Sequence, residues 1–343
     1  MLRRGLRVLT VAVVLAGAAA ASATATFRGR PGAIAYNYAF CAANSGHDCT
    51  QNGYALATVR PPRSARIRQS CLGAFDENAA ADITAPGSGA AGSGECTGFG
   101  RVGYSPDGRR IVYDANGHME VASSTGGQRF QFRDTPSSQP SFSPDGRRLV
   151  FVAGVQPSAA LIGLQRAGNV QAAIFTAALD GSHRSRVTAS RPGATPMSGR
   201  EPVFSPSGRE ILFVHNRTVW EIPAGGGRAS VLLPNADHPD FSPNGRRVVY
   251  IHDHQVWLAR ADGTYRHALR VNYPKSEISP EEVDEAVFSP DGRHIAIGGI
   301  AYNDNLDAAV WVAPSGGGVA TQVAGDDTPD GGTLFGLAWQ PVP

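Results

Sequence analysis

The sequence predicts an all-β protein, a six-bladed β-propeller with four antiparallel strands in each blade. One short motif occurs five times along the chain, which indicates a repeat protein and not a string of domains. The segments between the motifs repeat the same order of apolar runs and glycine turns. The two ends of the chain hold complementary parts of a sixth unit.

The motif begins with an aromatic residue, and its copies start at Tyr104, Phe142, Phe204, Phe241 and Phe288. Ser, Pro, a polar residue, Gly and a polar pair follow the aromatic residue. Pro presets φ for the first position of a turn, Asp or Asn suits the second, and Gly takes the left-handed conformation that closes it. The motif therefore predicts a β-hairpin. The apolar run after each turn, such as residues 149–152, is typical of a strand buried on both faces.

Each unit continues with a third and a fourth strand. Trp220 and Trp257 mark third strands at the same distance after their motifs, and a glycine turn then introduces the fourth strand. Two units carry insertions between the second and third strands, at about residues 154–172 and 298–307. The five repeats start near residues 101, 139, 201, 238 and 285.

The sixth blade is expected to be built from both termini. Residues 334–341 predict a first strand without its hairpin, and residues 32–70 predict second, third and fourth strands without a first. Their pairing would remove the exposed strand edges that an open array of blades presents. Residues 26–343 are therefore expected to form a single propeller domain, closed by its N- and C-terminal strands.

The five motifs resemble the repeat of the TolB-like β-propeller family, also called the WD40-like or PD40 repeat. The resemblance covers residues 32–341, and it implies a six-bladed propeller of the periplasm that binds other envelope proteins. Similar repeats occur in the propellers of prolyl-oligopeptidase-like enzymes. This sequence has neither their hydrolase domain nor a G-x-S-x-G elbow, so the resemblance favours a non-catalytic protein.

Residues 1–25 are typical of a secretory signal peptide, with Arg3, Arg4 and Arg7 before an apolar segment and small residues that suit cleavage after it. A retained anchor is the alternative. The formal net charge of +2 includes these arginines, so the mature chain carries 2 − 3 = −1 and offers no basic face for nucleic acid. We expect an exported monomer with no membrane span after cleavage, in the periplasm, the cell envelope or the extracellular space.

The four cysteines, Cys41, Cys49, Cys71 and Cys96, all precede the first complete motif. An even number of cysteines in an exported chain predicts disulfide bonds, and four cysteines allow three connectivities. We favour Cys41–Cys49 and Cys71–Cys96 because each bond closes one loop between neighbouring strands. The alternative is four unpaired or metal-binding thiols, but the sequence lacks the C-x-x-C spacing of a zinc site.

The residue three places before each motif aromatic is expected to face the mouth of the central channel. Five of these six positions are polar, namely Arg101, Gln139, Glu201, His238 and Glu285, and the sixth is Gly336. Turns between second and third strands are expected to add His118, His215, His252 and His254 on the same face. These are candidate ligand-binding residues. The alternative is that they hydrate the channel and pair with one another.

Histidines and carboxylates that converge on one channel can bind a metal, and His238, Glu201 and His252 are the candidate ligands. Such a set is similar to that of the manganese-binding propeller lyases that act on oligogalacturonate. Loop acids form a candidate calcium site, namely Asp304, Asn305, Asp307, Asp326, Asp327 and Asp330. No ligand spacing recurs, so a divalent metal is a candidate and no other cofactor is expected.

These observations favour an exported, non-catalytic binding scaffold that presents its channel-mouth face to an envelope protein or a cell-wall glycan. The alternative is a metal-assisted polysaccharide lyase or hydrolase that acts at the channel mouth. Charge is expected to be divided across this face. The basic residues, around blades two and three, are Arg166, Arg184, Arg186, Arg191 and Arg200. The acidic residues, around blades four to six, are the loop aspartates above with Glu277, Glu281, Glu282 and Asp284.

Overall fold

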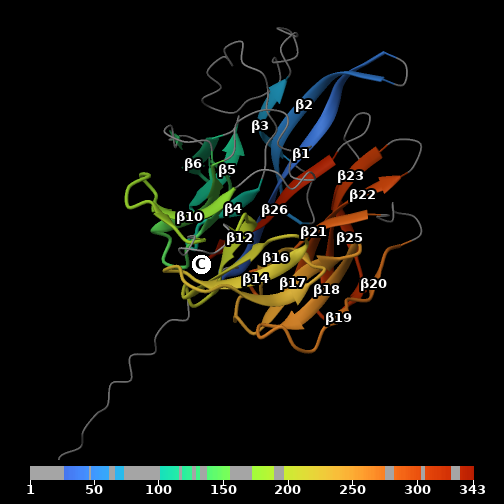
Figure 1. The fold of residues 1–343 in the computed structure, drawn as a ribbon. Helices are drawn as coiled ribbons and strands as arrows, with labels where there is room; N and C mark the ends of the chain where they lie inside the picture. The colour runs from blue at the N-terminus through green and yellow to red at the C-terminus, as the bar shows by residue number, and fades with distance from the viewer. Residues whose placement is uncertain are drawn as a thin grey trace, which may run out of the picture.

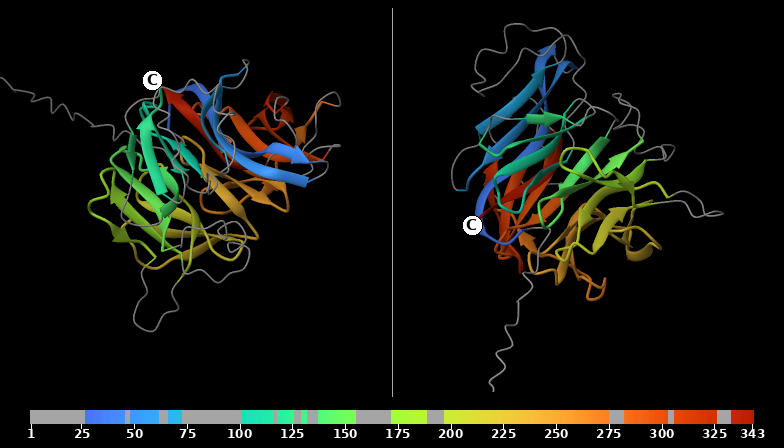
Figure 2. Two further views of the ribbon diagram at one scale, coloured as in Figure 1. Left: turned by 90° about the horizontal axis from the view of Figure 1, so that it is seen from above. Right: turned by 90° about the vertical axis from the view of Figure 1, so that its left-hand side faces the viewer.

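The computed structural model of the chain describes residues 27–45, 48–61, 66–72, 101–115, 118–125, 129–131, 137–154, 172–188, 197–274, 282–302, 306–325 and 333–343. These residues form six four-stranded sheets with antiparallel pairing, and they include no helix (Figure 1). Two further views show the sheets standing side by side as blades (Figure 2). The predicted six-bladed all-β propeller is confirmed.

Blades one to three each follow the chain from the innermost strand outward. Blade one comprises β4 (Val102–Tyr104), β5 (Arg110–Ala115), β6 (His118–Ser123) and β7 (Arg129–Gln131). Blade two comprises β8 (Ser137–Phe142), β9 (Arg148–Ala153), β10 (Ala173–Ala178) and β11 (Ser185–Arg186). Blade three comprises β12 (Arg200–Phe204), β13 (Glu210–Val214), β14 (Thr218–Pro223) and β15 (Ser230–Pro234).

Blade four comprises β16 (Asp237–Phe241), β17 (Arg247–His252), β18 (Gln255–Arg260) and β19 (His267–Ala268). Blade five comprises β21 (Glu282–Phe288), β22 (His294–Tyr302), β23 (Leu306–Pro314) and β25 (Thr321–Ala324). Blade six comprises β26 (Thr333–Val342), β1 (Arg30–Ser45), β2 (Asp48–Val59) and β3 (Arg66–Leu72). A short parallel pair, β20 (Val271–Asn272) with β24 (Gly318–Val319), links blades four and five, and the sequence did not reveal it.

The motif turns have the predicted geometry. In blade two the hydroxyl of Ser143 donates to Asp145 Oδ1 at 2.5 Å and accepts the backbone N–H of Arg148 at 2.9 Å. Gly146 closes the turn at φ 65°, in the left-handed region where a side chain is strained. The serine and the glycine are therefore required by the local backbone, since one caps its polar groups and the other permits its bend.

The motif also joins each blade to the next. A Cβ added to Gly146 would lie 3.2 Å from Pro106 Cδ of the preceding turn, so the turns of successive blades are in close contact. The guanidinium of Arg148 stacks over the ring of Phe204 in the next blade at 5.7 Å, and that of Arg110 stacks over Phe142 at 5.9 Å. The aromatic residue and the second polar residue of the motif thus contact each other between blades, a role that the repeat pattern alone did not show.

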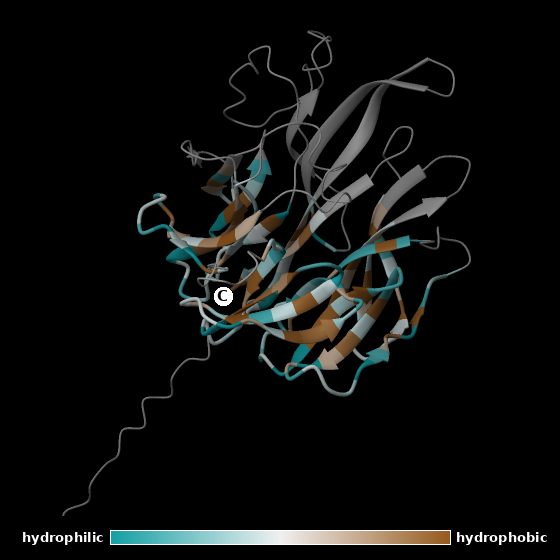
Figure 3. Cartoon of the chain, in the orientation of Figure 1, coloured by the Kyte–Doolittle hydropathy of each residue, from teal (hydrophilic) through white to brown (hydrophobic). Residues whose placement is uncertain are grey.

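Hydrophobic residues are concentrated along the strands, while hydrophilic residues gather in the turns (Figure 3). The buried residues form six clusters, one between each pair of neighbouring blades. Trp311 and Phe213 are fully buried in two of them. Because each sheet buries both faces against its neighbours, the apolar runs after the motif turns are continuous and not alternating.

The ring closes through blade six, as predicted. Strand β26 pairs with β1 in antiparallel register, with Ile34 opposite Trp339 and Arg30 opposite Val342. The indole N–H of Trp339 donates to the carbonyl of Gly32 at 3.3 Å, and the Arg30 guanidinium donates to the carbonyl of Pro343 at 2.8 Å. The two ends of the chain therefore share one sheet.

Two segments expected to be loops are instead extensions of hairpins. Strands β1 and β2 pair as far as Ser45 and Asp48, so the predicted loop between Cys41 and Cys49 is mostly strand. Strands β22 and β23 pair as far as Tyr302 and Leu306, so the blade-five insertion lengthens its blade. Both hairpins project beyond the shorter strands of the other blades (Figures 1 and 2). The repeat count located the additional residues, but it could not show that they continue the hydrogen-bonded ladder.

The strand register disfavours the predicted Cys41–Cys49 bond. Cys41 lies opposite Asn52, and Cys49 lies opposite Asn44, three residues further along β1. A disulfide joins Cα atoms about 4.4–6.8 Å apart, whereas three strand residues span about 10 Å. Cys96 lies outside the described residues, so the second pairing stays a prediction.

Several other predictions lie outside the described residues. They concern the signal peptide, most of the blade-two insertion, and the candidate calcium ligands apart from Asp307, which lies on β23 opposite Ala301. Within the part of the chain that the structure describes, no helix has the length and hydropathy of a membrane span.

Candidate functional site

The innermost strands of blades two to five each carry a bulge close to the predicted channel-mouth residue. The register slips between Ser138 and Ser141 in β8, and it slips at the same point in β12 and β16. In β21 it slips one residue earlier, at Asp284, and Glu285 stays paired with Gly298. The residues in the first three bulges, Gln139, Glu201 and His238, have φ values of 54°, 55° and 51°. Non-glycine residues rarely adopt this conformation, so the contacts of these residues must hold them in it.

Hydrogen bonds link these residues from blade to blade. The carboxylate of Asp114 in blade one accepts the backbone N–H of Gln139 at 2.8 Å. The side-chain oxygen of Gln139 accepts the N–H of Glu201 at 2.7 Å, and Glu201 Oε2 accepts the N–H of His238 at 2.7 Å. Gln139 and Glu201 therefore each supply the acceptor for the backbone donor of the next bulge, and Asp114 on β5 supplies it for Gln139.

Contacts between charged side chains continue the series from His238 to Glu285 and Arg101. The imidazole of His238 lies 3.5 Å from Glu201 Oε1 through Nε2 and 3.4 Å from Glu285 Oε1 through Nδ1. These separations are long for hydrogen bonds, so the contact is mainly electrostatic. Arg101 Nε lies 4.0 Å from Glu285 Oε1, across the place where blade six has Gly336 and no side chain. We call Arg101, Gln139, Glu201, His238 and Glu285 the inner ring.

The two carboxylates of the inner ring are buried. The side chains of Glu201 and Glu285 are 4% and 3% exposed, whereas that of His238 is 26% exposed. Burial by itself would raise the pKa of Glu201, but His238, Arg200 and Arg101 lower this pKa to about 2. Burial opposes the charge on His238, yet Glu201 and Glu285 raise its pKa. The structure thus brings together all five predicted mouth residues, and their contacts with one another match the alternative in which they pair.

Burial raises the pKa of Asp114, in contrast to the low pKa of Glu201. Asp114 lies in blade one and accepts the backbone N–H of the ring residue Gln139. Desolvation raises the pKa of Asp114 to about 8, although the backbone N–H groups of Gln139 and Arg101 act to lower it. This carboxyl is fully enclosed and has no strong cationic partner comparable to Arg200 at Glu201. Glu201 of the ring and Asp114 beside it therefore have widely different pKa values.

The turn histidines behave differently from the ring. His252 Nδ1 donates to the carbonyl of Asn235 at 2.5 Å, and its ring meets the indole of Trp257 edge-on at 4.9 Å. His215 makes the equivalent contacts in blade three, with Ser198 and Trp220. His252 therefore packs against its own blade and does not join His238 and Glu201 as a third ligand. The side chain of His118 lies outside the described part of the structure.

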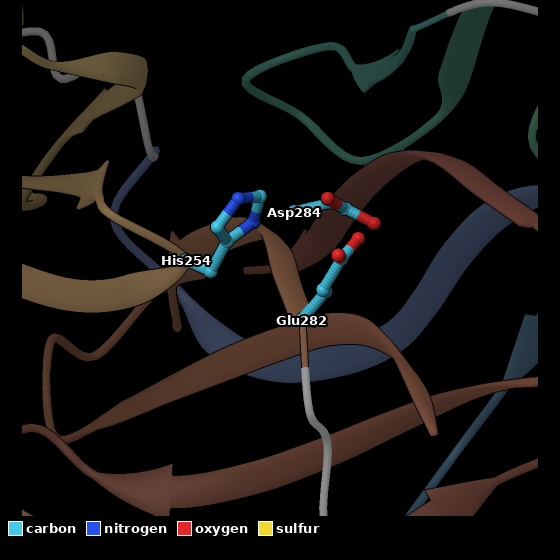
Figure 4. Close-up of side chains that lie close together, drawn as sticks. All are labelled: His254, Glu282 and Asp284. Atoms are coloured by element: carbon cyan, nitrogen blue, oxygen red, sulfur yellow. The ribbon is translucent and has the colours of Figure 1, made fainter. Parts of the chain in front are cut away.

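A different group meets at the outer edge of the mouth. Ligand atoms of His254, Glu282 and Asp284 all lie within 4.8 Å of one another, with the carboxylates of Glu282 and Asp284 pointing together (Figure 4). His254 comes from the β17–β18 turn, and the two acids come from the start of β21 in the next blade. Sequence reasoning named each residue but did not join them. The signal was available, because the turn of one blade and the first strand of the next recur at fixed spacing.

The basic side of the predicted charge division is only partly on this face. Arg184 stacks on Phe175 at 4.3 Å, so it covers an aromatic ring of its own blade. Arg200 forms ion pairs with Glu201 and Asp237, and Arg217 lies 3.9 Å from Asp237 Oδ2 and 3.5 Å from Asp253 Oδ1. We call Arg217, Asp253, His254, Glu282 and Asp284 the mouth rim.

No protein-family model matches the chain, and no curated protein matches it. Solved structures do resemble it. TolB from Acinetobacter baumannii aligns with 90% of this chain and 67% of its own, at 15% identity and a TM-score of 0.59. A putative TolB from Agrobacterium tumefaciens covers 90% of this chain and 99% of its own, at 15% identity and a TM-score of 0.54. A chain of a nidogen/laminin complex covers 90% and 98%, at 11% identity and a TM-score of 0.56. The chain is therefore a β-propeller that shares its fold with TolB.

Proposed function

We propose that this protein is an exported, non-catalytic binding scaffold of the cell envelope that takes a protein partner on its mouth face. The observation that carries the proposal is the contrast between the inner ring and the mouth rim. The charged groups of the inner ring pair with one another, since Glu201 and Glu285 flank His238 at 3.5 and 3.4 Å. The rim keeps charged groups accessible, with Asp253 72% exposed and Arg217 65% exposed.

The ring serves as a rigid platform in this proposal. Its bonds run between blades, so the mouth is held in one shape before a partner arrives, which lowers the entropic cost of binding. The enzymatic alternative needed His238, Glu201 and His252 as a metal-binding trio, and His252 is engaged with Asn235 and Trp257 instead. The groups of the ring that could act as acid or base are held in ion pairs.

The charge of the mouth rim indicates what kind of partner it would bind. Glu282 and Asp284 lie on blade five, beside the projecting β22–β23 and β1–β2 hairpins of blades five and six (Figure 1). Arg217 on blade three is neutralised by Asp237 and Asp253. The accessible charge is therefore acidic on one side of the mouth, and it favours a basic segment of an envelope protein. The resemblance of the motifs to TolB-like repeats supports a protein over a glycan, and the predicted signal peptide supports the location.

A charge-reversal capture experiment tests the proposal. Purified mature protein is used as bait on solubilised cell envelopes, with Asp253→Lys/Glu282→Lys compared with the wild type over a series of salt concentrations. The matched control is Arg109→Glu/Arg147→Glu, because these exposed arginines lie in motif turns at the opposite ends of the strands. We expect the rim variant to lose the captured protein and the control to keep it, with capture by the wild type falling as salt rises.

The contrary results are equally specific. If the control variant loses the partner while the rim variant keeps it, the partner binds the motif-turn face, and the assignment to the mouth face is wrong. If capture depends on glycan and survives protease treatment of the envelope, the partner is a cell-wall glycan.

A further inference from the structure

The contact between the turn of one blade and the first strand of the next can be compared at two junctions. One junction lies between blades three and four, and the other lies between blades four and five. In the first case the turn residue Arg217 lies 3.9 Å from Asp237 Oδ2 at the start of the next blade. Arg200 also forms an ion pair with Asp237. Two guanidinium groups thus face the carboxylate of Asp237, and they also pair with Glu201 and Asp253.

The equivalent place between blades four and five lacks these guanidinium groups. His254 occupies the turn position of Arg217, with φ 58° and 53° respectively, and Asp284 occupies the strand position of Asp237. Glu282 adds a second carboxylate. No arginine or lysine among the described residues forms an ion pair with either acid. Glu282 and Asp284 therefore face one imidazole and no guanidinium, whereas Asp237 at the neighbouring site faces two guanidiniums.

We propose that His254, Glu282 and Asp284 bind a divalent transition-metal ion, for which Zn²⁺ is the best fit. Their ligand atoms lie within 4.8 Å of one another and come from two adjacent blades (Figure 4). An imidazole nitrogen with two carboxylate oxygens is a donor set that Zn²⁺ accepts, with a fourth position left for water or a partner group. Ca²⁺ prefers six to eight oxygen ligands and fits a histidine poorly.

The geometry needs only a small closure to bind the ion. Donor atoms of a tetrahedral zinc site lie about 3.3 Å apart, given bonds of about 2.0–2.1 Å. His254 is exposed, and Glu282 and Asp284 are partly exposed, so side-chain rotation can bring the atoms together without moving the strands. The bound ion would connect the β17–β18 turn to β21 and would take the place that the arginines hold one blade earlier.

This site shares no residue with the inner ring, although Asp284 directly precedes Glu285, and it does not require the partner proposed above. It can therefore be tested with the metal alone. Mature protein without an affinity tag is stripped with a chelator and titrated with Zn²⁺ and then with Ca²⁺ by calorimetry, and bound metal is counted after equilibrium dialysis. The variants are His254→Ala and Asp284→Asn. The control is His267→Ala, an exposed histidine on β19 of the same blade whose Nδ1 faces the carbonyl of Tyr265.

We expect one Zn²⁺ per chain, a rise in the melting temperature on adding Zn²⁺, and weaker binding of Ca²⁺. His254→Ala and Asp284→Asn should each weaken Zn²⁺ binding by roughly a factor of ten or more, while His267→Ala leaves it unchanged. Melting curves recorded without metal show whether each variant is folded. The site is refuted if wild-type protein binds no stoichiometric Zn²⁺, or if folded variants bind it as tightly as the wild type. Loss of partner capture alone would not affect this conclusion, because no partner is present in the titration.

Discussion

Glu201 is an ionised carboxylate that the inner ring holds almost wholly out of water, at 4% side-chain exposure. Burial opposes this charge, but His238, Arg200 and Arg101 lower the pKa of Glu201 to about 2, below the ordinary value of 4.5. A pKa that is lower in the folded state makes the folded state more stable wherever the group is ionised. Glu201 therefore stabilises the propeller fully above pH 4.5, and this stabilisation is lost as the pH falls through 2.

The variant Glu201→Gln tests that linkage. It keeps an oxygen that can accept the N–H of His238 but removes the charge beside Arg200 and His238. We expect a loss on the order of 3 kcal/mol in the free energy of unfolding at pH 7, with the two proteins converging toward pH 2. Urea unfolding at several pH values measures it. The control is Glu221→Gln, because burial and Glu210 raise the pKa of Glu221 and removal of that charge should be neutral or stabilising at pH 7.

Substitutions at two motif glycines can distinguish the effect of backbone strain from that of steric conflict. Gly108 and Gly208 have nearly the same φ, 66° and 69°, so a substitution by Ala is strained equally in both. A Cβ at Gly108 would lie 1.9 Å from the carbonyl oxygen of Pro341, whereas at Gly208 the nearest atom is Pro144 Cδ at 3.5 Å. We expect Gly208→Ala to cost about 1–2 kcal/mol and Gly108→Ala to cost clearly more, because the terminal strand must shift. Equal losses in chemical denaturation would show that blade six does not press on the first turn.

At the scale of elements, the decisive strand is β26. It is the innermost strand of blade six, it pairs with β1, and it brings Trp339 and Leu337 into the cluster shared with blade five. Without it, β1 would present an unpaired edge toward the axis, and one inter-blade core would lose its filling. The propeller thus depends on its last residues for closure.

Deletion of residues 334–343 is therefore expected to leave the protein insoluble or to lower its melting temperature sharply. Trp339→Ala keeps the ladder and removes an indole that is 8% exposed, so it should cost about 3–5 kcal/mol and leave the protein folded. Thermal unfolding and size-exclusion chromatography distinguish the two. A truncated protein that stays monomeric and melts like the full chain would contradict closure by the shared blade.

At the scale of the whole molecule, the two faces of the propeller differ in kind. One face is made of the motif turns, which repeat closely and contact one another through Gly and Pro. The other face varies from blade to blade, with extended hairpins on blades five and six and acids on blade five. Functional residues tend to lie where a rigid scaffold tolerates variation, which favours the mouth face.

Export gives a further prediction for the whole chain. The small residues before residue 27 predict cleavage that leaves a mature N-terminus at Thr24 or Thr26. Phe27 is 7% exposed and belongs to the core between blades one and two, so cleavage after it would remove a core side chain. Intact mass measurement of protein from the native cell envelope checks this. A chain that retains residues 1–25 would indicate an anchor in place of a signal peptide.

The sequence alone determined the number of blades, the motif turns and the closure by both termini. These follow from local chemistry that repeats, because Pro, Asp and Gly set a turn within a few residues wherever Ser143-Pro144-Asp145-Gly146 or its copies occur. Only the tertiary structure decided which charged residues meet. Glu201 accepts from His238 37 residues away, and Gln139 accepts from Glu201 62 residues away, so each contact depends on how neighbouring blades dock.

The same reason explains the turn histidines. His252 and His254 lie in the same turn, and the sequence does not distinguish their roles. In the structure His252 packs on Trp257, whereas His254 faces Glu282 and Asp284 of the next blade. Two consecutive left-handed residues, Asp253 and His254, set these directions, and a one-dimensional pattern does not contain them. The hairpin lengths of blades five and six were likewise decided by strand pairing, because hydrogen bonds between strands can continue through residues that carry no repeat signal.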